Sequence, residues 1–205
     1  MQVRDATARS VAATARRSQI VAATIDTISD LGYRQASFAR IAQRAGLSST
    51  RLISYHFAGK DELMRAVIAD VSGEIRDFLT ERLRDLPDRR SALLTYIRAR
   101  IEYTATHRAR MDALMSIFLE FRGPADQRGD DSAAERRTLG YLQDLLVAGQ
   151  RSGEFRQFDP FVLASTIQRA IDSLPFLLRT APDLDLDSYA DEVATLFDLA
   201  TRKTP

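Results

Sequence analysis

The sequence predicts an all-α protein of about nine helices, in which a small N-terminal three-helix domain precedes a larger helical domain. Apolar residues recur every three or four positions along most of the chain, and no segment alternates with period two over the length of a strand. Gly or Pro follows most of these runs, as expected where helices end. With 205 residues and 45% hydrophobic composition, the chain is long enough for one sizeable core or for a small module joined to a larger one.

The composition excludes several kinds of site. The sequence contains no cysteine, which excludes disulfides, thiolate metal ligands and a cysteine nucleophile. The two histidines, His56 and His107, are far apart, so we expect neither a metal nor a cofactor. No run approaches 18 uncharged apolar residues, and the first fifteen residues hold no signal-peptide core. We therefore expect a cytoplasmic protein without a membrane partner.

The first part of the chain predicts an arm and one long helix. Residues 1–15 are small, polar and without helical period, which predicts a flexible N-terminal arm. From Arg16 onward apolar residues are spaced for a helix that closes at Gly32, because glycine readily adopts the left-handed conformation at a helix end.

Two short helices are predicted next, within a domain over residues 16–60. Ser37 is placed to cap the first of them, and Gly46 ends it. Ser48 is placed to cap the second, which the Ala-Gly pair at 58–59 ends. Because only a tight turn at Gly46 separates them, the two helices form a helix-turn-helix.

Six further helices are predicted over residues 61–205, which form the larger domain. The expected starts are Lys60, Asp88, a residue shortly before Met111, Ser132 with Glu135 as a capping box, Asp159 followed by Pro160, and Asp187. Pro87 ends the first of these helices, which contains Gly73, and Pro175 is expected to kink the fifth.

Charge is divided unevenly between the two parts. Residues 1–60 carry nine basic and three acidic side chains, a net charge of +6, whereas the remainder carries twenty basic and twenty-five acidic ones, a net charge of −5. A basic first domain favours binding to a polyanion, although a solvated basic face gives the same pattern.

The segment from Ile20 to Leu63 resembles the DNA-binding domain of the TetR family of transcriptional regulators. Four blocks carry the resemblance: the basic start and Gly-Tyr end of the first helix (16–33), the second helix with its turn (37–48), the end of the third helix (55–59) and the start of the fourth (60–63). One feature departs from the family pattern, because the segment between Gly46 and Phe57 is one residue longer and Ser54 replaces a tyrosine.

A helix of this kind reads DNA in the major groove through side chains near its N-terminus. Arg51 is the candidate guanine reader, and contact with a phosphate or with solvent is its alternative. Ser37 and Lys60 stand at helix starts, which favour phosphate binding or simple capping. The resemblance implies a phosphate contact for His56, and a partly buried histidine that makes a structural hydrogen bond is its alternative. The complete candidate DNA-binding set is Arg17, Ser37, Arg44, Ser48, Ser49, Thr50, Arg51, Ser54, Tyr55, His56 and Lys60.

The resemblance further implies a homodimer on a pseudo-palindromic double-stranded operator, with repression relieved by a small-molecule effector, largely apolar. The expected dimer residues on the last two long helices are Phe161, Ile167, Leu174, Leu178, Leu196 and Phe197. The expected effector-binding residues are Tyr96, Glu102, Tyr103, His107, Met111, Met115, Phe118, Phe121, Asp172 and Phe176, with Arg110 and Arg169 as further polar groups. Each of these apolar side chains fits an ordinary core equally well.

Two other classes of function predict different sequence features. An all-α enzyme would need a catalytic constellation, and the sequence shows no metal-spaced histidine pair, glycine-rich phosphate loop or nucleophile elbow, so we expect no enzyme. A structural or adaptor protein of the same fold without DNA binding is the alternative that the extra residue before Phe57 favours.

Overall fold

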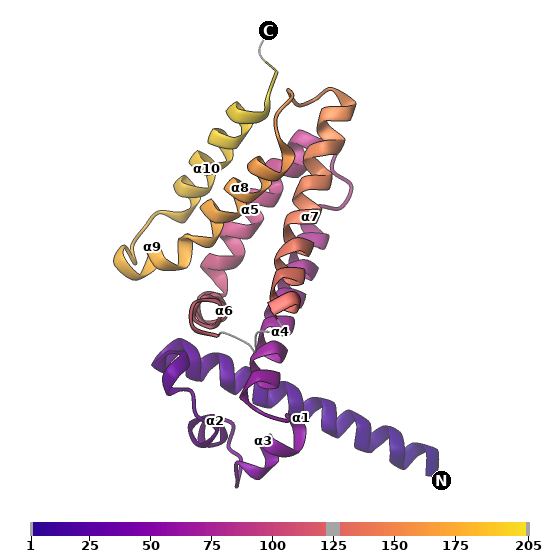
Figure 1. Ribbon diagram of the computed structural model, residues 1–205, viewed down its shortest axis with the longest axis vertical. Helices are drawn as coiled ribbons and strands as arrows, with labels where there is room; N and C mark the ends of the chain where they lie inside the picture. Colours follow the sequence, from indigo (N-terminus) through magenta and orange to yellow (C-terminus); the bar gives the residue numbers. More distant parts are fainter. Residues whose placement is uncertain (1, 122–127, 204–205) are drawn as a thin grey trace. The chain divides into compact units, whose positions relative to one another are not determined.

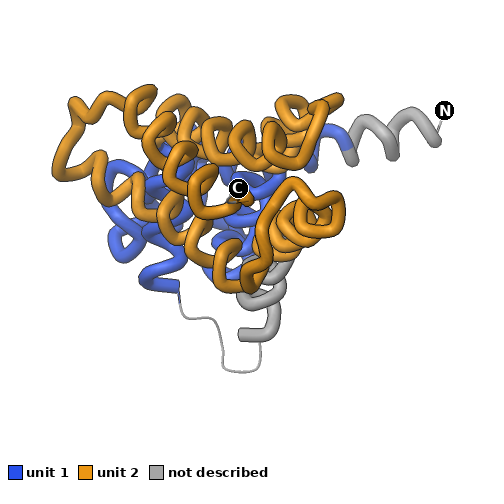
Figure 2. Tube along the Cα trace, turned by 90° about the horizontal axis from the view of Figure 1, so that it is seen from above, with its two compact units in different colours: residues 1–73, 109–123 blue, residues 74–108, 124–205 orange. Residues whose placement is uncertain are grey.

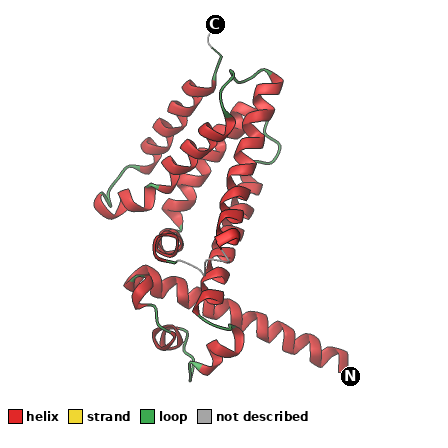
Figure 3. Cartoon of the chain, in the orientation of Figure 1, coloured by secondary structure: helices red, strands yellow, loops and turns green. Residues whose placement is uncertain are grey.

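The computed structural model describes the backbone of residues 2–121 and 128–203 and the side chains of residues 11–121 and 139–203. Within these ranges the chain is mostly helical, with short connecting loops, and forms no β-strand (Figure 3). Figure 1 follows the elements in chain order. They are α1 (Gln2–Leu31), η1, a 3-10 helix (Tyr33–Gln35), α2 (Phe38–Arg44), α3 (Arg51–His56), α4 (Lys60–Arg82), α5 (Arg89–Thr106), α6 (Arg108–Glu120), α7 (Arg128–Ser152), α8 (Pro160–Asp172), α9 (Leu174–Thr180) and α10 (Leu186–Thr201).

The all-α class is confirmed, and the helix expected after Asp159 is divided in two. The break falls at Ser173, between α8 and α9, and Pro175 lies in the first turn of α9. Proline suits that position because the first backbone N–H groups of a helix have no partner within it. The division explains why ten α-helices occur in the described residues where about nine were expected.

The segment expected as a flexible arm over residues 1–15 has a helical backbone from residue 2 onward, because α1 begins at Gln2. This segment contains several Ala and Arg residues, which are among the strongest helix formers. The intrinsic helix propensity of these residues therefore extends α1 over a segment that has no helical pattern of apolar residues.

Several predicted helix starts are confirmed and others are wrong. The Asp88 carboxylate accepts a hydrogen bond from the Ser91 N–H at 2.6 Å, and Asp159 caps α8 as expected. The cap of α10 is Asp185 rather than Asp187, because Asp185 accepts from the next two free N–H groups of that helix.

The predicted bounds of α7 and α4 also change. α7 begins at Arg128, so Ser132 lies inside the helix rather than at its start, and residues 122–127 of the expected preceding loop lie outside the described residues. α4 ends at Arg82, five residues before Pro87.

The chain forms two compact units, shown in Figure 2. The first comprises Met1–Gly73 with Ala109–Gly123, and the second comprises Glu74–Arg108 with Pro124–Pro205. The sequence placed the division at residue 60 instead. No break occurs there because α4 is one continuous helix, and the first unit also takes most of α6.

The core of the first unit is built by α1, α2, α3 and the start of α4. Ile20, Ile28, Ile41, Ile53 and Leu63 contribute fully buried side chains from these four helices. They hold the helix-turn-helix against α1.

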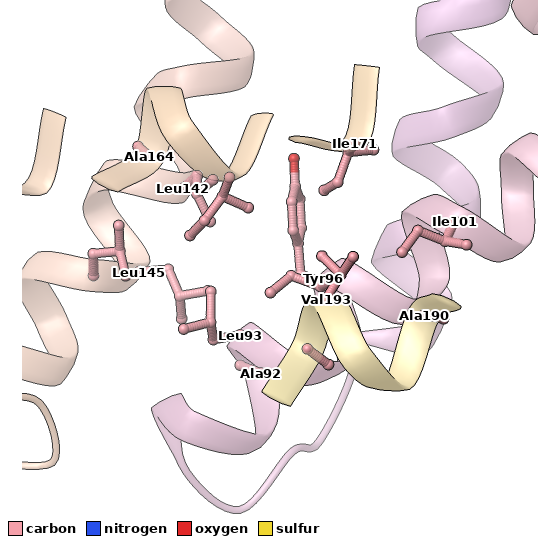
Figure 4. Packing of buried hydrophobic residues seen from close by; sticks show 14 of the residues in the cluster. Ala92, Leu93, Tyr96, Ile101, Leu142, Leu145, Ala164, Ile171, Ala190 and Val193 are labelled. Carbon is pink, nitrogen blue, oxygen red and sulfur yellow. The ribbon is translucent and has the colours of Figure 1, made fainter. Parts of the chain in front are cut away.

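The core of the second unit surrounds α5, which contacts α7, α8, α9 and α10. Figure 4 shows Tyr96 of α5 among apolar side chains of its neighbours, including Leu142 of α7, Ile171 of α8 and Val193 of α10. Burying such side chains stabilises the fold by about 1.5–3 kcal/mol each relative to exposure.

The segment Pro160–Thr180 is apolar and long enough to cross a membrane by length and composition. In the structure it is the broken pair α8 and α9, and it contributes Ile167, Ile171 and Leu174 to the core cluster. Packing within the second unit thus accounts for part of its apolar character, whereas Phe161, Val162, Phe176 and Leu177 of the same segment are exposed.

Candidate DNA interface and effector site

The helix-turn-helix forms as the sequence predicts. The Ser37 hydroxyl accepts a hydrogen bond from the Arg40 N–H, which caps α2. Gly46 has a φ of 63°, a left-handed conformation that glycine adopts without steric cost, and the Leu47 N–H reaches back to the Ala42 carbonyl at 2.8 Å. These bonds set the angle at which the chain leaves α2 for α3.

The cap of α3 differs from the prediction. The Ser49 hydroxyl, rather than that of Ser48, accepts a hydrogen bond from the Arg51 N–H at 3.1 Å. Thr50 precedes the helix and makes no side-chain cap bond. Ser48 is consequently an exposed residue of the turn, and Arg51 is the first residue of the helix.

The outer face of α3 is polar and open to solvent. Arg51 and Ser54 are exposed, and Tyr55 is 82% exposed, whereas Ile53 and Phe57 are buried beneath them. The Tyr55 ring meets the half-buried His56 ring edge-on, with centroids 5.1 Å apart. Arg51 has no ion-pair partner within the described part of the chain. An exposed arginine and tyrosine on a short helix are side chains that a DNA groove can accept.

Arg17 holds the domain together instead of lying free for DNA. Its guanidinium donates hydrogen bonds to the His56 carbonyl oxygen and, at 2.9 Å, to the Glu62 carboxylate. It also lies over the Phe57 ring, 4.1 Å from the centroid. Three contacts from one side chain therefore tie α1 to the end of α3 and the start of α4.

Arg44 and Lys60 are also engaged within the first unit. Arg44 pairs with Asp30 at 2.6 Å between exposed side chains, a contact that a phosphate can replace at small cost. The Lys60 ammonium donates to the Tyr33 carbonyl at 3.1 Å and lies 4.2 Å from the centroid of the Tyr33 ring.

Burial lowers the pKa of Lys60, while Glu120 and Asp61 act in the opposite direction. Burial also raises the pKa of Tyr33. The pKa of Glu62 lies below its usual value because its carboxylate accepts hydrogen bonds from the Ala58 N–H and from Arg17. Glu62 is thus ionised at neutral pH and caps the start of α4.

The expected effector-binding residues fall into two groups. Met111, Met115, Phe118 and Phe121 belong to the first unit, and the others belong to the second. Phe118 is 50% exposed and Phe176 is 39% exposed, so neither is part of a buried core. Helical spacing shows which apolar residues share a face of a helix. It did not show which face of α6 or α9 is exposed to solvent.

Tyr103 and His107 stack on one another in the second unit, with ring centroids 4.2 Å apart and planes at 6°. Phe78 meets the Tyr103 ring edge-on at 5.3 Å. The Tyr103 hydroxyl donates to the Glu74 carboxylate at 2.9 Å. Glu102 does not join this group, because it is exposed and paired with Arg82 at 2.6 Å.

The predicted dimer residues divide into exposed and buried ones. Phe161 is 55% exposed and Leu196 is 61% exposed, which suits an interface. Ile167, Leu174 and Leu178 are buried in the core of their own chain, so their predicted role is wrong, and Phe197 packs against that core. Val162, Leu177 and Leu199 are exposed apolar residues of α8, α9 and α10 that the sequence analysis did not select.

Tyr96 and Asp172, two other predicted effector-binding residues, belong to one polar cluster on α5 and α8. The Tyr96 hydroxyl donates to Gln168, whose amide donates to Asp172 at 2.7 Å. Arg100 of α5 completes the cluster, with Nη2 3.5 Å from Asp172, and was missed by the sequence analysis. Its spacing was the available signal, because it follows Tyr96 by four residues on the buried face of α5.

A short polar helix presented by a helix-turn-helix, on a chain with a separate all-α unit, defines a DNA-binding regulator. The model of the family described as "Bacterial regulatory proteins, tetR family" matches residues 20–67. An HTH-type transcriptional regulator, BetI of Cronobacter sakazakii, is 35% identical over 87% of this chain and 91% of its own length. The chain therefore belongs to the tetR family of bacterial regulatory proteins.

Solved structures share the fold over nearly the whole chain. The fatty acid degradation regulator FadR from Bacillus halodurans matches with a TM-score of 0.77 at 19% identity, over 89% of this chain and 94% of its own. AibR, solved with isovaleryl coenzyme A and operator DNA, matches with a TM-score of 0.76 at 16% identity, over 88% of this chain and 97% of its own.

Proposed function

We infer that this DNA-binding regulator acts as a homodimeric repressor in the cytoplasm, places α3 in the major groove of a pseudo-palindromic operator and is released by a small molecule. The observation that carries the proposal is the exposed polar face of α3, on which Arg51 follows the Ser49 cap directly. An arginine at the start of such a helix reaches base edges, and it can donate to both O6 and N7 of a guanine.

The side chains around α3 take the supporting roles. Ser54 and Tyr55 lie one turn further along and face the same groove, while Ser48, Ser49 and Thr50 approach the backbone. Ser37 and Arg44 contact phosphates from α2. Half or more of the hydrogen bonds in protein–DNA complexes go to phosphate and sugar, and these contacts fix the register of the reading helix.

Lys60, His56 and Arg17 act mainly through the shape of the domain. Their contacts with Tyr33, Tyr55 and Glu62 position the end of α3 and the start of α4. A phosphate at the N-terminus of α4 would still be attracted by Lys60 and by the helix dipole.

Dimerisation follows from the apolar side chains that α8, α9 and α10 leave uncovered. They are Phe161, Val162, Phe176, Leu177, Leu196 and Leu199. Exposed apolar groups of this size favour association when they form a contiguous surface. Two paired chains would hold their reading helices about 34–36 Å apart, one turn of DNA.

An effector that binds in the second unit releases the protein from its operator. AibR was solved with isovaleryl coenzyme A, and FadR from Bacillus subtilis, which matches with a TM-score of 0.75 at 20% identity, was solved with stearoyl-CoA. These structures support a fold that accommodates a small molecule with an apolar portion. The buried ring of Tyr96 and the stacked pair Tyr103–His107 are apolar contacts for such a ligand in this chain.

Selection of bound sites from random duplex DNA by the purified protein tests the proposal. The expected result is a symmetric consensus, with affinity that falls with salt at a log–log slope near −0.9 per phosphate neutralised. An asymmetric consensus contradicts the dimer, and failure to enrich any sequence at low salt favours the adaptor alternative.

A further inference from the structure

Arg100 is a charged side chain that the fold of the second unit buries and leaves incompletely bonded. It lies in the middle of α5 and is 4% exposed. Its Nη2 lies 3.5 Å from Asp172, whereas Nε and Nη1 find no hydrogen-bond acceptor among the described residues. Three N–H bonds of a buried guanidinium thus lack a partner.

The neighbours of Arg100 leave its Nε and Nη1 without an acceptor. The Tyr96 hydroxyl donates to the Gln168 amide oxygen at 3.3 Å, and the Gln168 amide donates to Asp172 at 2.7 Å. Arg169 lies 3.7 Å from the other carboxylate oxygen of Asp172. The side chains of Gln168, Arg169 and Arg100 therefore all contact Asp172, and the contact with Arg100 is a long one.

Burial also keeps the Tyr96 hydroxyl in its donor form. Desolvation raises the pKa of Tyr96, although the positive charge of Arg100 opposes the shift. At neutral pH the cluster consequently presents the unpaired donors of Arg100 beside a neutral phenol.

This arrangement is costly unless something completes it. More than nine in ten buried polar groups in native proteins have a hydrogen-bond partner, and a buried charge without its bonds destabilises a fold strongly. Beyond the polar cluster the core is apolar, with Ile97, Ile101 and Ile171 all buried in it. An aliphatic side chain at position 100 would suit such a core better, so the arginine needs another explanation.

The charges of the cluster indicate the missing group. Arg100 and Arg169 carry two positive charges, and Asp172, with which both pair, carries one negative charge. Because Asp172 is shared with Arg169, an anionic oxygen is the acceptor that would complement the unpaired donors of Arg100. Because Nε and Nη1 lie on different edges of the planar guanidinium, a carboxylate on Nη1 leaves Nε for a second oxygen, such as a carbonyl or a water.

We propose that Arg100 binds the carboxylate of the effector, whose apolar body packs among the side chains around Tyr96. The proposal rests on the effector-controlled function above and specifies the chemical class of the ligand as a monocarboxylate. Tyr141 of α7 stacks on Tyr96 with centroids 5.9 Å apart and is 46% exposed, so the cluster lies one ring beneath the surface of the second unit.

Thermal unfolding and titration calorimetry of the full chain test the proposal. The probes are straight-chain monocarboxylates from acetate to dodecanoate, together with benzoate, and the primary amide of each acid. We expect at least one acid to raise Tm and its amide to have little effect, because the amide lacks the charge. Arg100→Met should weaken binding of that acid roughly 10- to 100-fold.

Arg98→Met is the matched control, because Arg98 lies on the same helix but is exposed and paired with Asp191. It should leave the affinity for the acid unchanged. Without ligand, Arg100→Met should keep or raise Tm, since it removes unpaired buried donors. A large loss of Tm in ligand-free Arg100→Met would show that the arginine serves the fold and would overturn the proposal.

Two results separate this proposal from the general function. If no acid in the series shifts Tm, or acids and amides bind alike, the carboxylate site is wrong even when the protein binds its operator. If an acid binds through Arg100 but the protein selects no DNA, the carboxylate site stands and the proposed operator function fails. Where both hold, the acid should release wild-type protein from the operator and should not release Arg100→Met.

Discussion

Arg17 on α1 donates a hydrogen bond to the carboxylate of Glu62 on α4, with Nη2 and Oε1 2.9 Å apart. The same guanidinium reaches the His56 carbonyl and covers the Phe57 ring, so one side chain joins the first helix to both ends of the connection between α3 and α4. The orientation of the reading helix thus depends on a residue 39 positions before His56.

Arg17→Ala should lower Tm by about 2–4 °C, as expected for a net loss of ~1 kcal/mol in a chain of this size. The loss comes mainly from the bond to the His56 carbonyl and the contact with Phe57, because the pair with Glu62 is solvated. Differential scanning calorimetry measures it. Arg16→Ala is the control, since Arg16 bonds its neighbour Gln19 and no other side chain within the described residues, and an equal loss in both variants would contradict the role of Arg17.

Gly149→Ala should destabilise the second unit by roughly 1–3 kcal/mol. A methyl group there would lie 2.1 Å from the ring of Phe155, which is itself fully buried. Gly140→Ala on the same helix meets nothing within 4 Å and should stabilise it by up to about 1 kcal/mol through helix propensity. Denaturant unfolding compares the two, and the same sign for both variants would show that Phe155 yields easily.

Asp198→Asn should lower Tm by a few degrees at pH 7, and the difference from wild type should shrink as the pH falls below 4. Hydrogen bonds from Arg90 hold the pKa of Asp198 below its ordinary 3.8. A lowered folded-state pKa stabilises the protein above pH 4 or so, and this contribution is lost as pH falls through the folded value. Melting curves from pH 7 to pH 3 check it, and a pH-independent difference between the proteins would argue against the Arg90 pair as the source.

Arg51→Ala should weaken binding to the selected operator by ~1–3 kcal/mol and relax the preference at one base pair of each half-site. Fluorescence anisotropy with operator variants measures both effects. Lys60→Ala should leave base preference intact, because the Lys60 ammonium lies against Tyr33. Unchanged preference in Arg51→Ala would remove Arg51 from direct base reading.

Leu196→Glu should convert the dimer to a monomer and weaken operator binding. Leu196 is 61% exposed on α10, and a charge there would be desolvated in an apolar interface. Sedimentation velocity measures the change. Thr80→Glu adds the same charge at an exposed position of α4, which contributes no side chain to the proposed dimer surface, and should remain dimeric. Two dimeric variants would place the interface elsewhere.

Much of the first unit follows from local sequence. The cap at Ser37 and the left-handed glycines at 32 and 46 depend on residues a few positions apart, so they were predicted correctly. The start of α1 was not, because its first turns have helix-forming residues but no apolar period. The effector-binding set was least predictable, since it combines residues that belong to different compact units.

The sequence by itself determined the all-α class, the helix-turn-helix and the family, because helical period, caps and turn glycines act over one or two turns of chain. Only the tertiary structure decided that Arg17 supports the domain, that Ile167 lies in the core while Leu196 faces solvent, and that Arg100 is buried without its full set of bonds. The physical reason is that a helical pattern shows which residues share a face. Whether that face is covered depends on side chains from helices that are distant in the sequence. Their packing decides which charged side chains stay solvated and which are desolvated.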